Sequence, residues 1–470
     1  MRFITPAIVF AVLITGAANA ETAITPEQRT GVALTLYSDG FGLIKDRRTV
    51  ALSSGANTLA FEGVSAKMTP SSALVRAGSG FRVLEQNFEF DLISPKNLLR
   101  RSVGKTVRVI RTHPTTGEDQ IETAHVLATE QGVVLRIGNR IETGVPGRLV
   151  FDSIPQGLRA QPTLLLEVDS NKAQTRDIEL SYLTEGLGWR AEYAAEIDAS
   201  GKTLDLSAWA SLSNNTGTAF TNAHVQLVSG DVKRERETRQ LAFKGRAMMA
   251  EAAAAPMAQE AIGDLHLYSL PRAVTLKNRQ TKQVALLSAA GVSVSRAYSH
   301  DRWISERGPQ IKPAKPVIFR PNVFLKIDNS KSNGLGASLP AGLVRVYERD
   351  SGGKIQFAGE QGIGHVAADE KMSLELGKAV DIGITFEQTA FTTADLPKRT
   401  FEAAFKIELT NAKGKPVTVR LVEKFNGSTK ILSESIPHKE FSGAAAVWAI
   451  DVPAGGKSAL TYRVRVSRPR

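Results

Sequence analysis

The fold class is decided by the sequence LSYLTEGLGWRAEYAAEI at Leu180–Ile197 and LDLSAWASLSNNTGTAFTNAHVQLVSGD at Leu204–Asp231. Apolar and polar residues alternate in both stretches, which is the pattern of β-strands with one buried face. Glycines at Gly186 and Gly188 and the cluster Asn214–Gly217 interrupt the alternation, as turns do between strands. No catalytic motif lies in this region, so it predicts a layer of β-sheet and no particular reaction.

The first residues have the features of an export signal. Arg2 is a short charged region, Phe3–Ile14 is apolar, and Ala18-Asn19-Ala20 is a small-residue cleavage site. The apolar run is shorter than the roughly 20 residues that span a bilayer. We therefore expect cleavage after Ala20, no later transmembrane segment, and a periplasmic or secreted bacterial protein. An uncleaved anchor is the alternative.

The chain of 470 residues contains no cysteine and carries a formal net charge of +12. Disulfides, thiolate metal sites and cysteine nucleophiles are therefore excluded, and stability must come from hydrophobic cores. A basic exported protein meets envelope proteins and anionic glycan or lipid surfaces before it meets nucleic acid. The alternative is that the scattered charge serves solubility alone.

The N-terminal part, residues 21–162, predicts short strands separated by turns. Ser94 followed by Pro95 is the best helix start, because serine caps the first turn and proline fits its first position. Gly104 follows closely, so this helix is expected to be short.

The central β region is expected in two parts, residues 163–233 and 265–385. Asp198–Gly201 and Glu348–Gly353 are turn sequences between strand-like runs, so each predicts a hairpin.

Between these two parts, residues 234–264 are rich in alanine and charge. We expect a flexible insertion with some helical tendency. Its basic residues Arg234, Arg236 and Arg239 are candidates for contact with an anionic ligand or membrane, although a solvated linker is the simpler interpretation.

Residues 386–470 have the clearest pattern. In the final strand, aliphatic and aromatic side chains alternate with polar ones, so one face is buried and the other is solvated. The buried face comprises Leu460, Tyr462, Val464 and Val466, and the solvated face Thr461, Arg463, Arg465 and Ser467. The chain is therefore predicted to be all-β, with multidomain antiparallel β-sandwiches and an Ig-like C-terminal sandwich.

The stretch from Leu180 to Val232, together with Leu339–Ile382 and the C-terminal VTVRLVEKF and VPAGGKSALTYRV, resembles a bacterial domain-of-unknown-function family. Its named members are the mucoidy inhibitor A proteins. The resemblance implies an exported β-rich protein with a link to exopolysaccharide production, and it carries over no catalytic residues. This chain lacks the long charged heptad segment of those proteins, so a coiled-coil arm is expected to be missing.

Candidate chemistry is sparse. His365 lies near Asp369 and Glu370, a combination able to bind a metal or move protons. A metal site needs three or more convergent ligands, so a structural turn is favoured. Glu348 and Asp350 share one strand face by parity, but they border a hairpin, where charges are usually solvated.

Among the aromatic residues, Trp189 and Tyr193 are expected in the core, with a sugar-stacking platform as the alternative. Trp303 has charged and turn-forming neighbours, so we expect it to be exposed or at a domain junction.

These features favour a non-catalytic cell-envelope protein that binds or scaffolds, without a cofactor or metal. Its candidate contact residues are Trp303, Arg234, Arg236, Arg239 and His365. The alternative is a carbohydrate- or peptidoglycan-active hydrolase whose carboxylates meet only in the folded chain. A role in surface assembly is a third possibility.

Overall fold

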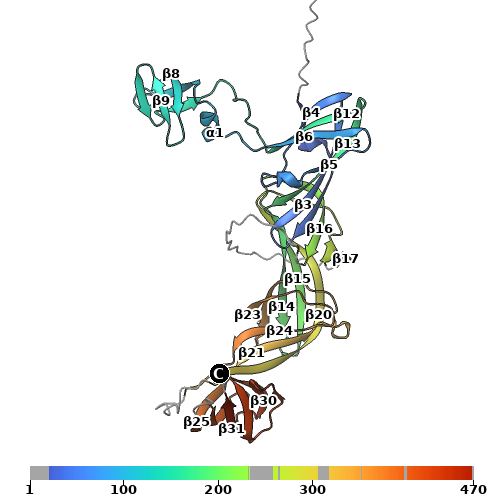
Figure 1. The fold of residues 1–470 in the computed structure, drawn as a ribbon, viewed down its shortest axis with the longest axis vertical. Helices are drawn as coiled ribbons and strands as arrows, with labels where there is room; N and C mark the ends of the chain where they lie inside the picture. The colour runs from blue at the N-terminus through green and yellow to red at the C-terminus, as the bar shows by residue number, and fades with distance from the viewer. Residues whose placement is uncertain are drawn as a thin grey trace, which may run out of the picture. The chain divides into compact units, whose positions relative to one another are not determined.

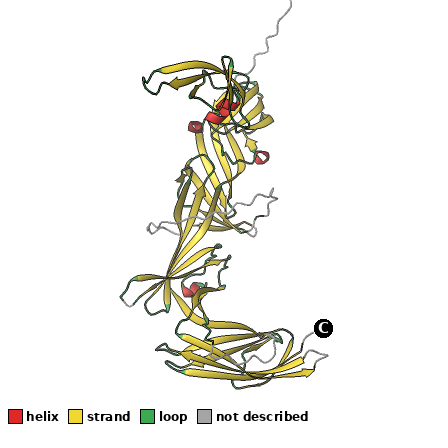
Figure 2. Cartoon of the chain, turned by 90° about the vertical axis from the view of Figure 1, so that its left-hand side faces the viewer, coloured by secondary structure: helices red, strands yellow, loops and turns green. Residues whose placement is uncertain are grey.

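The computed structural model describes residues 21–230, 232, 258–262, 265–304, 317–350, 352–395 and 400–467. Figure 2 shows that strands dominate these residues and that helices are few and short. The strands form five sheets, most of whose ladders are antiparallel. The predicted all-β, multi-sheet fold is therefore confirmed.

The described residues divide into two compact units. Unit 1 holds the chain up to Trp189 together with Leu212–Val228 and Ala258–Lys282, and unit 2 holds Arg190–Ser211, Ser229, Gly230 and the chain from Gln283 onward. Each unit thus collects segments that are distant in sequence, whereas the predicted domains follow one another along the chain.

Unit 1 contains a four-stranded and an eight-stranded sheet. The first has the order β1 (Thr22–Ile24), β4 (Gly55–Glu62), β12 (Thr163–Ser170) and β6 (Phe81–Glu89). The second has the order β17 (Ala258–Ile262), β18 (Leu265–Ser269), β16 (Phe220–Ser229), β2 (Arg29–Tyr37), β3 (Phe41–Leu52), β13 (Gln174–Glu185) and β5 (Leu74–Arg76), with β19 (Val274–Leu276) beside β16.

Alternation in β3 places two charged residues in the core of unit 1. Ile44, Asp46, Arg48 and Val50 all point inward, and Arg48 is completely buried. Its guanidinium donates to Asp46 and to the carbonyl oxygens of Ile24 and Glu62, each at 2.7 Å. This arginine therefore provides hydrogen-bond donors, from inside the core, for the carbonyl oxygens at the ends of β1 and β4.

A separate five-stranded sheet lies within the predicted N-terminal β domain. Its order is β10 (Arg140–Thr143), β9 (Val134–Ile137), β8 (Asp119–Ala128), β7 (Thr106–Thr112) and β11 (Arg148–Val150). Its core is formed by Val107, Val109, Ala124, Val126, Leu135 and Ile137, against Leu99 of α1 (Pro95–Arg100).

The predicted helix start at Ser94 is confirmed, because the Ser94 Oγ accepts a hydrogen bond from the Asn97 amide at 3.1 Å. We predict that Ser94→Ala lowers the unfolding free energy of this small sheet by about 1 kcal/mol, through loss of that cap. Hydrogen exchange of the Val107 and Val109 amides measures the effect. Ser79→Ala, at an exposed position, serves as the control, and equal exchange in the two variants would refute the cap's contribution.

Unit 2 is built on a ten-stranded sheet. Its main order is β23 (Ile355–Ile363), β22 (Gly342–Arg349), β14 (Leu187–Ile197), β15 (Thr203–Asn214), β20 (Gln280–Ile304), β27 (Val417–Phe425), β30 (Ala445–Val452) and β29 (Glu440–Phe441). In addition, β21 (Asn322–Asp328) pairs with both β20 and β24 (Lys371–Lys378). The predicted hairpin at Glu348–Gly353 is present, since β22 and β23 pair antiparallel.

The C-terminal part is a sandwich of two sheets, whose red strands β25, β30 and β31 lie together in Figure 1. One sheet is β25 (Ile382–Asp395), β26 (Thr400–Asn411), β31 (Lys457–Ser467) and β28 (Ser428–Glu434). The other is formed by the end of β20 with β27, β30 and β29. In β31 the four predicted core residues are buried and their neighbours point outward.

Two features differ from the sequence-based expectation. The sandwich includes Tyr298 and Ile304 of β20, which lie far before residue 386. In addition, β1–β4, β2–β16, β14–β22 and β20–β27 are parallel pairs. Parallel partners need a long connection, so local turn sequences do not reveal them.

The last part of the predicted flexible insertion 234–264 is a strand. Ala258–Ile262 form β17, which pairs antiparallel with β18. A ladder with a neighbouring strand here overrides the helical tendency of alanine. The rest of that insertion and residues 1–20, where an export signal is predicted, lie outside the described residues. No helix in the described ranges has the length and apolar character needed to cross a membrane.

Candidate functional site

The outer face of the sheet formed by β20, β27, β30 and β29 carries the most exposed tryptophan among the described residues. Trp303 on β20 is 68% exposed, and it lies opposite Lys424 of β27 in a parallel ladder. We call this surface the Trp303 face, and we define it by Trp303, Asp301, Arg420, Val422, Lys424, Glu440 and Val447.

One ion pair, Lys424–Asp301, lies beside the indole, and a second, Arg420–Glu440, lies four residues farther along the ladder. Within each pair the two charges offset each other. Lys424 Nζ lies 2.7 Å from the Asp301 carboxylate and 5.9 Å from the centre of the Trp303 ring. Arg420 lies 3.3 Å from the Glu440 carboxylate. All four side chains remain partly exposed, so their unused donors and acceptors face water.

The aliphatic residues of this face are covered. Val422 and Val447 point outward by strand parity but are only 6% exposed. Among the residues that define this face, the indole is therefore the exposed apolar group, and the charged Lys424 and Asp301 lie beside it.

The opposite side of the same strands anchors the face. Arg302 bonds Glu423 at 3.0 Å, and its guanidinium lies 4.2 Å from the centre of the Phe386 ring and 4.8 Å from that of Phe405. Burial raises the pKa of Glu423 despite the Arg302 charge that opposes the shift. Glu423 is 1% exposed, so this carboxylate lies out of reach of a substrate and holds the sheet in place.

His365 lies in a loop and has a structural environment. Its Nδ1 accepts the Ala341 amide hydrogen at 3.2 Å and lies 3.0 Å from the Ser229 Oγ. Because an amide nitrogen can only donate, Nδ1 is the acceptor in the Ala341 contact. Ser229 is 1% exposed, so this serine–histidine contact is not an accessible nucleophile.

The Glu370 carboxylate and the Asp369 backbone near His365 bond within the loop. Glu370 accepts from the Ala367 amide at 2.9 Å, and the Asp369 amide donates to the Asn329 carbonyl at 2.8 Å. Within the described ranges, no group of three histidine, aspartate or glutamate side chains could hold a metal ion. The structure thus favours the turn interpretation of His365.

The other predicted contact residues are not brought to the Trp303 face by any described element. Arg234, Arg236 and Arg239 lie outside the described residues. Of the five predicted contact residues, the structure therefore supports Trp303 as an accessible one and places His365 in a loop contact.

Glu348 and Asp350, the two carboxylates considered for glycoside cleavage, are both engaged in contacts within the fold. Glu348 pairs with Arg296. Asp350 accepts from the amides of Gly352 and Lys354 at 2.9 Å within its own hairpin, and bonding to Lys354 and Gln356 lowers its pKa.

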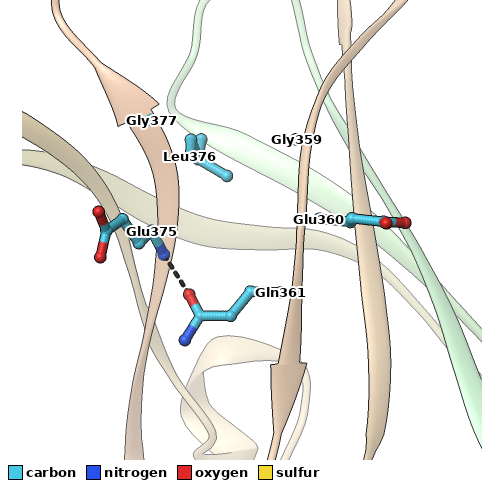
Figure 3. A pocket seen from close by; sticks show the side chains of 6 residues that line it. All are labelled: Gly359, Glu360, Gln361, Glu375, Leu376 and Gly377. Atoms are coloured by element: carbon cyan, nitrogen blue, oxygen red, sulfur yellow. Dashed lines mark hydrogen bonds between the residues drawn. The ribbon is translucent and has the colours of Figure 1, made fainter.

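A shallow hollow of about 540 Å³ lies between β23 and β24. At this hollow Gln361 Oε1 accepts the Glu375 amide hydrogen and so connects the two strands. Figure 3 shows the carboxylates of Glu360 and Glu375 on the outer sides of their strands, pointing away from each other. In this arrangement the two carboxylates do not face each other as a hydrolytic pair does.

Sequence reasoning missed Arg302, Glu423 and Lys424. One signal was available, since Glu423 occupies an inward position in the alternation Val419, Leu421, Glu423, Phe425. A charged residue at a core position predicts a buried partner. The identity of that partner depends on the parallel pairing of β20 with β27, which no local pattern encodes.

Comparison with known proteins identifies the family to which this chain belongs. A search of curated proteins found no match. The family model of DUF4139, described as a domain of unknown function, matches residues 178–470, which is more than half of the chain and includes every residue of the Trp303 face. The chain therefore belongs to the DUF4139 family of domains of unknown function.

Proposed function

We propose that this chain is a non-catalytic binding or scaffolding protein of the bacterial cell envelope, exported to the periplasm or beyond after cleavage at Ala20. The observation that carries the proposal is the exposed Trp303 on a sheet anchored from beneath by Arg302 and Glu423. Such a surface favours contact with a large ligand, whereas a small substrate is normally enclosed in a pocket.

The charges support the same interpretation. Most of the excess positive charge belongs to positions outside the described ranges, such as Arg234, Arg236 and Arg239. On the Trp303 face each cation has a carboxylate partner. We therefore assign recognition to the aromatic face, and general attraction to anionic envelope surfaces to these basic positions.

The resemblance to mucoidy inhibitor A proteins supports a link to exopolysaccharide or surface assembly. In this proposal the chain participates by holding a component in place, and it performs no bond cleavage.

The test is capture of partners from crosslinked periplasm with the chain from Glu21 onward. Trp303→Ala is the probe, and Phe357→Ala is the matched control, because Phe357 is also on a strand of unit 2 and is 60% exposed. The proposal predicts protein or glycan species that are lost with Trp303→Ala and kept with Phe357→Ala. Failure to recover any reproducible species, or identical recovery with both variants, would contradict it.

A further inference from the structure

We infer that the Trp303 face binds an uncharged polysaccharide, by stacking one pyranose ring on the exposed indole. This inference rests on the proposed binding function and assigns its site and ligand class. It concerns Trp303, Asp301 and Lys424 in the first place.

The indole provides the stacking surface. The face of an aromatic ring is negative and the C–H bonds of a sugar ring are weakly positive, so the two attract when they lie parallel. A pyranose with axial hydrogens on one side presents such a flat C–H surface. Trp303 suits this contact because it is 68% exposed. Its backbone is held in place by the regular pairing of β20 with β27.

The neighbouring ion pair provides the hydrogen bonds. Lys424 Nζ has three protons and Asp301 two carboxylate oxygens, and only part of this capacity is used in their 2.7 Å contact. Both groups are partly exposed, with 34% and 50% of their side chains accessible. A pair of adjacent sugar hydroxyls can donate to the carboxylate and accept from the ammonium without disrupting the pair.

The surroundings favour sugar over protein. Aromatic anchors in protein interfaces lie in dry, well-packed apolar regions. Here Val422 and Val447 are covered, and the described groups beside the indole, Lys424 and Asp301, are charged and partly exposed. A hydroxyl-rich ligand matches this surface because it retains hydrogen bonds to water and to the protein after binding.

The charges favour an uncharged glycan over an acidic one. Asp301 neutralises Lys424, and Glu440 neutralises Arg420. Among the residues that define this face, a uronic acid carboxylate would thus meet no cation without a carboxylate partner, and it would be repelled by Asp301 and Glu440.

Trp303 is also the natural reporter for the test. The chain has four tryptophans. Trp189 and Trp448 are buried, with 4% and 0% exposure, and Trp209 is partly buried. Iodide should therefore quench one fraction of the emission selectively, and Trp303→Phe should abolish that fraction.

The experiment titrates the chain from Glu21 onward with chitotetraose and cellotetraose, and in a parallel arm with polygalacturonate. We expect a saturable blue shift and protection from iodide with at least one neutral oligosaccharide. Isothermal titration should show binding weakened at least about tenfold by Trp303→Ala, a smaller loss with Asp301→Asn, and no change with Phe357→Ala.

Three outcomes would overturn the inference. These are no binding of either neutral glycan, binding that Trp303→Ala leaves intact, and tight binding of polygalacturonate alone through Trp303. If neutral glycans fail but the crosslinking experiment still yields a species dependent on Trp303, the ligand class is wrong and the proposed function remains. If that species is also absent, the proposed function fails as well.

Discussion

Asp46→Ala is expected to lower the unfolding free energy of unit 1 by about 3–5 kcal/mol, the usual effect of removing one partner of a buried ion pair. Asp46 is 1% exposed and bonds two arginines, Arg29 at 2.8 Å and Arg48 at 2.7 Å. Without the carboxylate, the completely buried Arg48 would retain a charge with no counterion. Its remaining contacts are two carbonyl oxygens and the ring of Phe61, 4.2 Å from the guanidinium carbon.

Arg47→Ala is the matched control. Arg47 lies between Asp46 and Arg48 in the same strand but points outward, where its pair with Glu179 is largely exposed. Exposed pairs contribute about 0–1 kcal/mol, so this variant should be nearly as stable as the wild type. Urea unfolding measures both, with hydrogen exchange of β3 amides assigning the transition to unit 1. Equal stabilities of the two variants would contradict the buried cluster.

The same cluster predicts a pH dependence. Burial alone would raise the pKa of Asp46, but the hydrogen bonds and charges of Arg29 and Arg48 lower it below the ordinary value of 3.8. A carboxylate with a lowered folded pKa stabilises the fold above its unfolded pKa and loses that contribution in more acidic solution. Unit 1 of the wild type should therefore lose stability below about pH 4, and Asp46→Asn should flatten this part of the profile.

Arg302→Ala is expected to have the second large effect, a loss of about 3–5 kcal/mol in the C-terminal sandwich at neutral pH. Glu423 is 1% exposed, and Arg302 is the cation that offsets its charge. Burial already raises the pKa of Glu423. Removing Arg302 raises this pKa further, since the opposing attraction is gone.

The sign of the pH effect distinguishes this prediction from a simple packing defect. A carboxylate with a raised folded pKa destabilises the fold once it ionises, so the loss is largest above the folded pKa. This loss of stability disappears below the pKa of glutamate in the unfolded chain, about 4.5. Arg302→Ala should thus recover stability in acid, and the double variant Arg302→Ala, Glu423→Gln should recover part of it at neutral pH. A deficit that is constant with pH would contradict the pairing.

Local patterns predicted the local elements well. The alternation of Leu460, Tyr462, Val464 and Val466 defined the buried face of β31, because successive side chains leave a strand on opposite faces. Ser94 and Pro95 marked the start of α1, and the hairpin after Arg349 followed from its turn residues. These features depend only on neighbours within about ten residues.

The pairing of strands that are distant in the sequence could not be predicted from local patterns. The strand β20 runs from Gln280 to Ile304 and pairs in parallel with β27, more than a hundred residues later. This pairing brings Trp303 beside Lys424 and Arg302 beside Glu423. The exposure of Trp303 could be predicted from its charged neighbours, whereas its partners on the face could not.

The most direct test of the account is a single incubation of the chain with chitotetraose and cellotetraose, in which tryptophan emission and the mass of each glycan are followed together. We predict a saturable emission change that requires Trp303, with both glycans keeping their full length indefinitely. Shortened glycans, produced equally by the wild type and by Trp303→Ala, would show that the chain is a hydrolase acting elsewhere and would contradict the account.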